Sequence, residues 1–189
     1  MKAHLINVGT YLPERRVNNL DRLEEFEVDE DFILNKTGVA KVSRKGLEET
    51  GTSMCLKAWE RLLAKQSDAA EAVDALIVVT QNPDNNIPHM SAILHGALEL
   101  PKNCLTFDIS LGCSGFVAAL ATMDGLIRAG TIKRGLIFTC DPYSVVVDDH
   151  DKSTALLFGD GAAVTLSVVM GSMRSALLIS APSAETGTI

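Results

Sequence analysis

Apolar residues along this chain recur in two alternating patterns, which predict strands and helices in turn. The run ALIVVT at 75–80 is almost entirely apolar and rich in β-branched residues, which is typical of a strand buried on both faces. Between 52 and 65 the apolar positions are spaced three and four apart, which predicts a helix with a cap in Gly51-Thr52-Ser53. The same patterns predict further strands at 3–10, 104–109, 135–140, 162–169 and 175–180, and further helices at 88–99 and 114–129.

The order of these elements predicts an α/β fold. Strands that alternate with helices form a mostly parallel sheet, with right-handed crossovers and helices covering both faces. The last two strands are expected to form a hairpin around Gly171-Ser172, and 37–50 and 142–154 are expected to be loops. We infer a main α/β unit over 1–170, followed by a strand and a short remainder over 171–189. Functional residues gather at the carboxyl ends of the strands in such sheets.

Composition and charge narrow the class of protein. The formal net charge of −7 argues against nucleic-acid binding, because neutralising phosphates requires a basic surface. No apolar run approaches the roughly 20 residues of a membrane span, and the first residues resemble a strand and a turn more than a signal peptide. We therefore expect a cytoplasmic protein that binds small molecules or proteins, and neither membranes nor nucleic acids. A local basic patch is interpreted as solvated surface, with phosphates or an acidic carrier protein as the alternative; its members are Arg15, Arg16, Lys41, Arg44 and Lys45.

One of the four cysteines has a reactive setting. The chain has neither C-x-x-C spacing nor a histidine at a zinc-finger offset, so no metal site is predicted, and reduced thiols are expected in the cytoplasm. Cys55, Cys104 and Cys140 lie in predicted helices and strands, which favours packing. Cys113 lies in DISLGCSGF, at the turn between a predicted strand and a predicted helix.

The turn at Cys113 supports two interpretations. A helix N-terminus presents unpaired N–H groups and a partial positive charge, which favour a thiolate over a thiol. Gly112 and Gly115 remove bulk beside the sulfur, so that a carbonyl group can approach and an oxyanion can be stabilised, as covalent acyl transfer requires. The other interpretation is a small buried cysteine whose glycine neighbours allow a strand and a helix to pack closely.

Three motifs, taken in order, add a family resemblance. TGV at 37–39, DISLGCSGF at 108–116 and FGDGA at 158–162 resemble the β-ketoacyl-acyl carrier protein synthase III family of the thiolase superfamily, and the similarity extends over about residues 3–169. The resemblance implies a thiolase-like fold of two repeated α/β halves, of which this chain matches the first. It also implies that Cys113 takes an acyl group from acyl-CoA and passes it to a carbanion. The family forms that carbanion by decarboxylating a malonyl-type extender on an acyl carrier protein.

The resemblance carries further expectations about binding. It implies a homodimer with acyl-CoA as a substrate and no tightly bound cofactor. Phe32 and Lys36 stand where the family often has a tryptophan and an arginine for coenzyme A, and Lys152 replaces another coenzyme-contacting arginine. Lysine lacks the planar fork of arginine, so these positions depart from the usual recognition of acyl-CoA. Ile87 replaces a common phenylalanine in a loop that contributes to a partner's acyl pocket, which implies a different acyl preference. Ordinary core packing stays open for Phe32 and Ile87.

The family's catalytic histidine and asparagine belong to its second half. None of the four histidines of this chain matches that role. The leading hypothesis is therefore an acyltransferase or condensing enzyme of which this chain is the first half. The alternatives are a non-catalytic or split half that pairs with another thiolase-like chain, and a cysteine hydrolase. Asp160 in FGDGA is expected to hold backbone N–H groups in a tight turn.

Overall fold

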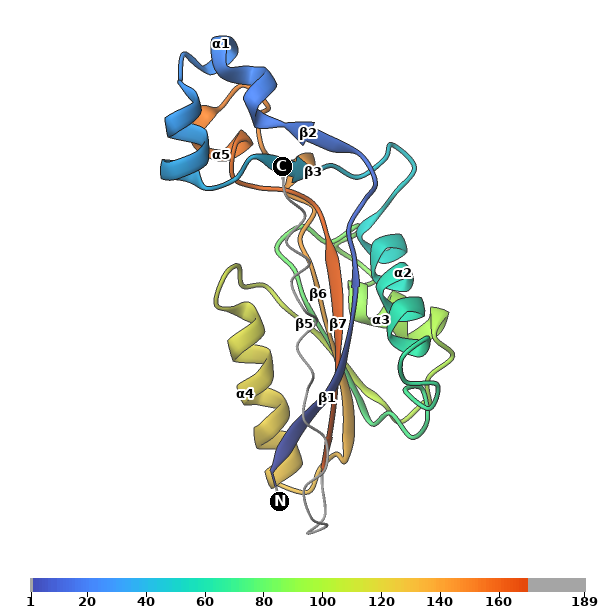
Figure 1. Ribbon diagram of the computed structural model, residues 1–189. Helices are drawn as coiled ribbons and strands as arrows, with labels where there is room; N and C mark the ends of the chain where they lie inside the picture. Colours follow the sequence, from blue (N-terminus) through green and yellow to red (C-terminus); the bar gives the residue numbers. More distant parts are fainter. Residues whose placement is uncertain (1, 170–189) are drawn as a thin grey trace.

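The computed structural model describes residues 2–169, which form a central sheet with helices on both faces and a small cap at one end (Figure 1). The five strands follow the order β1-β7-β6-β4-β5. Their bounds are β1 (Ala3–Tyr11), β4 (Ala75–Val79), β5 (Leu105–Ile109), β6 (Arg134–Cys140) and β7 (Ala162–Val169). β4 runs parallel to β5 and β6, whereas β7 runs antiparallel to both β1 and β6. The expected α/β class, with a mainly parallel centre, is confirmed.

Helices cover both faces of this sheet, as the sequence predicts. α2 (Gly51–Leu63) and α3 (Met90–Ala97) lie on one face, and α4 (Gly115–Arg128) lies on the other (Figure 1). Side chains alternate between the two faces of a strand, so the neighbours Leu76 and Ile77 of β4 enter different cores. The fully buried β4 is therefore the strand on which both layers of helices rest.

α2 illustrates how the sequence specifies an element and its packing. Thr50 and Ser53 form a reciprocal cap, in which each side-chain hydroxyl accepts the other's backbone N–H, at 2.9 and 3.1 Å. The apolar face of α2 packs on β1 and β7. Gly9 of β1 permits this approach, because a Cβ there would collide with the backbone of Ala58 and Leu62.

The cap consists of short elements held together by a few long-range contacts. Its elements are β2 (Arg16–Asn18), β3 (Lys41–Ser43), η1 (Asn19–Arg22), α1 (Leu23–Phe26), the π-helical turn η2 (Phe32–Thr37), η3 (Tyr143–Val145) and α5 (Lys152–Ala155). The buried Asn19 links two segments of the cap that are far apart in the sequence: its Nδ2 donates to the carbonyl of Val39 at 2.7 Å and to that of Leu156 at 2.9 Å.

Three local expectations need correction. The loop predicted at 37–50 contains β3, which pairs with β2, and the loop predicted at 142–154 contains η3 and α5. Arg44, interpreted as solvated, is 4% exposed, because its guanidinium donates to the carbonyls of Phe158 and Ala155 inside the cap. The hairpin partner predicted for β7 at 175–180 lies outside the described residues, and within them β7 pairs with β1 and β6.

Candidate active site

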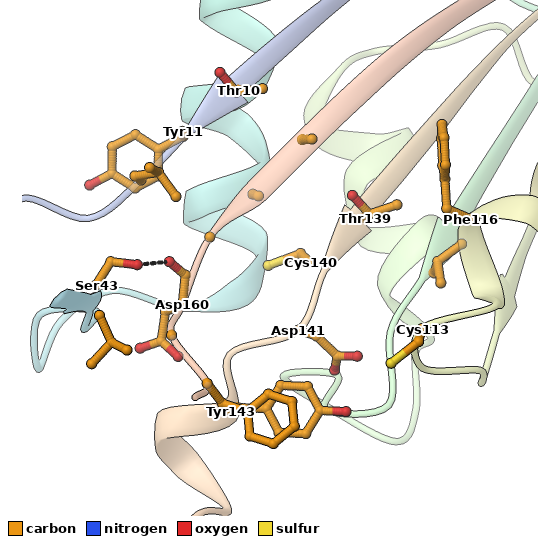
Figure 2. A pocket seen from close by; sticks show the side chains of 18 of the residues that line it. Thr10, Tyr11, Ser43, Cys113, Phe116, Thr139, Cys140, Asp141, Tyr143 and Asp160 are labelled. Atoms are coloured by element: carbon orange, nitrogen blue, oxygen red, sulfur yellow. Dashed lines mark hydrogen bonds between the residues drawn. The ribbon is translucent and has the colours of Figure 1, made fainter. Parts of the chain in front are cut away.

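A large open cavity lies where the sheet, the start of α4 and the cap meet, and Cys113 forms part of its wall (Figure 2). The cavity volume is about 1020 Å³. Its lining combines residues of β1, β7 and the end of β6 with the turn before α4 and the first residues of α4, among them Thr10, Thr165, Thr139 and Phe116. The carboxyl ends of β4, β5 and β6 therefore lead to the same space, as expected for an α/β sheet.

Cys113 lies in the turn that follows β5 and precedes α4, and its side chain is exposed. The interpretation of Cys113 as a small buried cysteine is therefore wrong. Close packing of a strand and a helix does explain the glycine at position 115, because a Cβ on Gly115 would collide with the side chain of Val79 in β4. A Cβ on Gly112 would lie 2.7 Å from Oε1 of Gln81, so this glycine leaves room for a neighbouring polar side chain.

The other three thiols differ from Cys113 in their burial. All four cysteines lie within residues 2–169, and Cys55, Cys104 and Cys140 are buried there. Burial raises the pKa of the Cys104 thiol to about 11, and burial followed by contact with Cys140 raises that of Cys55. A raised pKa favours the unreactive thiol form. The expectation that these three cysteines serve packing is confirmed.

Two polar side chains stand next to the Cys113 turn. The Tyr143 hydroxyl donates to Oε1 of Gln81 at 2.8 Å, and it lies 3.7 Å from the position that a Cβ on Gly112 would take. The Tyr143 ring stacks on Phe158 with the ring centroids 4.6 Å apart. Figure 2 shows Tyr143 and Cys113 facing the same cavity. We define the polar wall as the side chain of Tyr143, which lines the cavity, together with that of Gln81, which is exposed and accepts the Tyr143 hydrogen bond.

Sequence reasoning did not single out the polar wall. Tyr143 and Gln81 are 62 positions apart and meet only because β4 and β6 are neighbours in the sheet. One signal was available: Gln81 directly follows the predicted strand 75–80 and Tyr143 lies three residues after the predicted strand 135–140, and sites form at such strand ends in α/β sheets.

Asp160 fixes the loop that carries Tyr143. This buried carboxylate accepts the backbone N–H of Lys45 at 2.7 Å and that of Ser144 at 3.0 Å. The hydroxyl of Ser43 donates to the Asp160 carbonyl, as Figure 2 shows. The expectation that Asp160 holds backbone N–H groups is confirmed, but these groups belong to Lys45 and Ser144 and not to the FGDGA turn itself.

The residues suggested for coenzyme A gather in the cap, away from the Cys113 cavity. The ammonium groups of Lys36 and Lys152 lie 5.8 and 5.7 Å from the ring centroid of Phe32. Phe32 itself is half-buried against the core of the cap. Ile87 is 90% exposed, which is inconsistent with core packing. None of these four residues is among those that line the cavity with Cys113.

Other groups sought at this site are not found in the described part of the chain. Within residues 2–169 no histidine lines the cavity. The same residues contain no cluster of three or more side chains able to hold a metal ion. No helix in this part is both long and apolar enough to pass through a bilayer.

Comparisons with known proteins agree with this geometry. Residues 107–181 match the family model of 3-oxoacyl-[acyl-carrier-protein (ACP)] synthase III. The β-ketoacyl-ACP synthase III of Acidiphilium cryptum is 35% identical over 162 residues, which are 86% of this chain and 50% of that protein. That of Streptococcus suis is 35% identical over 164 residues, covering 87% of this chain and 50% of that protein.

Solved structures give the same result at the level of the fold. The Thermus thermophilus β-ketoacyl-ACP synthase III superposes with a TM-score of 0.83 at 30% identity, over 89% of this chain and 52% of that one. The priming β-ketosynthase of the R1128 polyketide pathway has a TM-score of 0.81 at 26% identity, over 88% of this chain and 50% of that one. The chain spans about half the length of the relatives it matches.

Proposed function

This chain belongs to the 3-oxoacyl-ACP synthase III family and matches about half the length of its members, and from this premise we propose that it supplies the acyl-accepting half of a condensing enzyme. The observation that carries the proposal is the exposed Cys113 thiol at the strand–helix turn, facing a cavity large enough for an acyl thioester. We further propose that the enzyme acts in the cytoplasm in fatty acid or polyketide-type synthesis.

The chemistry proceeds in two transfers. The Cys113 thiolate attacks the carbonyl carbon of acyl-CoA, the new C–S bond forms, and coenzyme A leaves as a thiolate that takes up a proton. The first turn of α4 has N–H groups without intrahelical acceptors, and these stabilise the oxyanion of the intermediate. In the second transfer a malonyl-type group on an acyl carrier protein loses CO₂. The resulting carbanion attacks the Cys113 thioester, which forms the C–C bond and returns the thiolate.

The cluster of Phe32, Lys36 and Lys152 is the proposed contact for coenzyme A. A half-buried ring flanked by two ammonium groups offers a stacking surface for adenine together with positive charge for phosphates. Because lysine donates as a point charge without a planar fork, we expect this contact to be weaker than an arginine-based one. Acyl groups delivered by a carrier protein, which has no adenine, would bypass it.

The edge strand β5 is the proposed dimer contact. It ends the sheet order, so the backbone groups on its outer side have no partner within the described sheet. Leu105 of β5 is 41% exposed. A second copy pairing along β5 would join two sheets into one and cover this edge.

A condensing role fits the matched proteins better than the alternatives. The relatives and structures described above carry the names of synthases, and none is named as a non-catalytic pairing subunit. A hydrolase would need a base beside Cys113; no histidine of the described residues lines that cavity, and the Asp141 carboxylate that does line it already accepts the backbone N–H groups of Gln81 and Asn82.

Intact-mass spectrometry after incubation with acetyl-CoA tests the proposal. We expect one acetyl adduct on the wild-type chain and on Cys104→Ala, which removes a buried thiol, and none on Cys113→Ala. The proposal fails if the wild-type chain gains no adduct, or if Cys113→Ala gains the same one.

A further inference from the structure

The polar wall of Tyr143 and Gln81 lies beside the glycine that precedes Cys113. Oε1 of Gln81 lies 2.7 Å, and the Tyr143 hydroxyl 3.7 Å, from the Cβ position of Gly112. Gly112 directly precedes Cys113, and consecutive Cα atoms are about 3.8 Å apart. Cys113 and Tyr143 line the same cavity, so a group attached to the sulfur enters a space bordered by the phenol, whose hydrogen-bond partner is the Gln81 carboxamide.

The wall is held in place from both ends. Tyr143 stacks on Phe158, and the residue after it donates its backbone N–H to the buried Asp160 at 3.0 Å. The backbone N–H of Gln81 donates to Oδ1 of Asp141 at 3.0 Å. Burial, followed by the nearby charges of Asp141 and Cys113, raises the pKa of the Tyr143 phenol, so the hydroxyl keeps its proton at neutral pH.

The wall also has unused hydrogen-bonding capacity. The Tyr143 proton is committed to Oε1 of Gln81, which fixes the orientation of the carboxamide. No residue within 2–169 accepts from Nε2 of Gln81, so both of its hydrogens are available to a ligand. The Tyr143 oxygen retains its lone pairs as acceptors. An oxygen on a bound acyl group can thus accept from Nε2, and a hydroxyl can also donate to the phenol.

We propose that Tyr143 and Gln81 are specificity-determining residues that favour acyl groups with a 3-oxo or 3-hydroxy oxygen over plain alkyl acyl groups of the same length. This inference rests on the proposed function of Cys113. Such an oxygen is four bonds from the sulfur and lies in the cavity that Cys113 shares with Tyr143. A plain alkyl chain placed there removes water from the carboxamide without replacing its hydrogen bonds, which is unfavourable.

Thiol–disulfide exchange measures this preference without acyl transfer. The full chain is equilibrated with equal amounts of bis(2-hydroxyethyl) disulfide and dipropyl disulfide, together with both parent thiols. Exchange breaks the reagent S–S bond, forms a new one to Sγ of Cys113 and releases one reagent thiol. The two adducts differ only by a hydroxyl in place of a methyl group. The hydroxyl lies four bonds from Sγ, as the 3-oxygen of an acyl group does. Intact mass then gives the adduct ratio, normalised to the ratio on free cysteine.

We expect the wild-type chain to favour the hydroxyethyl adduct by about threefold to tenfold, as one net hydrogen bond would give. Gln81→Leu removes the donors and should bring the ratio to about one, while Tyr143→Phe keeps the stack on Phe158 and should lower it partway. Tyr11→Phe is the matched control. It changes the other tyrosine of the same cavity, whose hydroxyl is bound to Glu49, and should leave the ratio unchanged.

Two results would overturn the inference: a wild-type ratio of one, or a preference that survives in Gln81→Leu. Acylation with 3-hydroxybutyryl-CoA and butyryl-CoA separates it from the proposed function. Acyl adducts on Cys113 without a disulfide preference would refute the proposed role of the polar wall but not the proposed function of the chain. If Gln81→Leu abolished a disulfide preference and neither thioester gave an acyl adduct, the proposed role of the polar wall would be supported and the proposed function would be refuted.

Discussion

The two faces of the sheet use the same strands for different purposes. In β7, Val164 and Leu166 enter the core beneath α2, whereas Ala163 and Thr165 line the cavity that holds Cys113; Ala162, at the end of the strand, contacts both. Both sets come from one run of eight residues, because side chains alternate along a strand. The first set is buried in the core, and the second set lines the cavity.

This difference shows how a site can be built on a stable fold. The face under α2 and α3 carries the larger core and is closed by two helices. Among residues 2–169, α4 is the helix that covers the opposite face, and the end of this face is open at the Cys113 turn. Stability and access therefore come from opposite sides of the same backbone, and substitutions on the two sides should have different consequences.

Neighbouring substitutions in β7 should give the largest contrast. Leu166 is fully buried under α2, so Leu166→Ala should lower the free energy of unfolding by about 2–5 kcal/mol. Ser167 is also fully buried, but no residue within 2–169 bonds its hydroxyl, so Ser167→Ala should change stability by less than about 1 kcal/mol. Urea unfolding midpoints of the two variants measure the difference. Equal losses from both would contradict the assignment of the two faces.

Substitutions at two glycines compare how well each face of the sheet tolerates an added methyl group. A Cβ on Gly9 would meet the backbone of Ala58 and Leu62 in α2, so Gly9→Ala should destabilise the chain by about 3 kcal/mol. A Cβ on Gly135 would collide with the end of the flexible Met123 side chain in α4 and would only touch the backbone, at 3.4 Å from the Ala75 oxygen, so Gly135→Ala should cost about 1 kcal/mol. Thermal unfolding compares the two, and a larger loss from Gly135→Ala would reverse our ordering of the faces.

Asp160 joins the cap to the open face, and its replacement should loosen that junction. Asp160→Asn weakens two charge-assisted hydrogen bonds to backbone N–H groups and should cost about 2 kcal/mol. Asp148→Asn is the matched control, since this exposed carboxylate also accepts a backbone N–H, at 2.9 Å. Denaturation in urea should separate the two variants. If the control lost as much stability, burial of Asp160 would not be the cause.

Periodicity alone predicts the main elements of this fold. The helical spacing around α2 and the apolar run of β4 are local signals, and both elements lie where they were expected. The placement of Cys113 at a strand's carboxyl end followed from the same order of elements. The grouping of Phe32, Lys36 and Lys152 came from the family resemblance, and their shared position is consistent with it.

What the sequence did not reveal depends on contacts between distant residues. The residues around Arg44 in the sequence predict an exposed side chain. Its burial is favourable because it donates to carbonyl groups of residues more than 100 positions away. The pairing of β7 with β1 joins the two ends of the described chain, which no short pattern encodes. The polar wall is the same kind of case, because neighbouring strands bring Tyr143 and Gln81 together.

The smallest change in stability is expected from substituting Glu49, which binds the end of β1 and a lysine of α2. Glu49 accepts the backbone N–H of Gly46, the ammonium of Lys57 and the Tyr11 hydroxyl, and in that order they lower its pKa from 4.5 to about 2. A pKa that is lower in the folded state contributes stability above the unfolded value, and this contribution is lost as the pH falls from 4.5 towards 2. Glu49→Gln should therefore be less stable than the wild type at pH 7, and the gap should narrow by pH 3. Glu48→Gln, at an exposed neighbouring position, is the control and should show no such narrowing. If the difference in stability between Glu49→Gln and the wild type stayed constant with pH, the side chain would contribute by packing on Tyr11 and not by its charge. The electrostatic link between β1, which lines the cavity, and α2, which covers the other face of the sheet, would then be refuted.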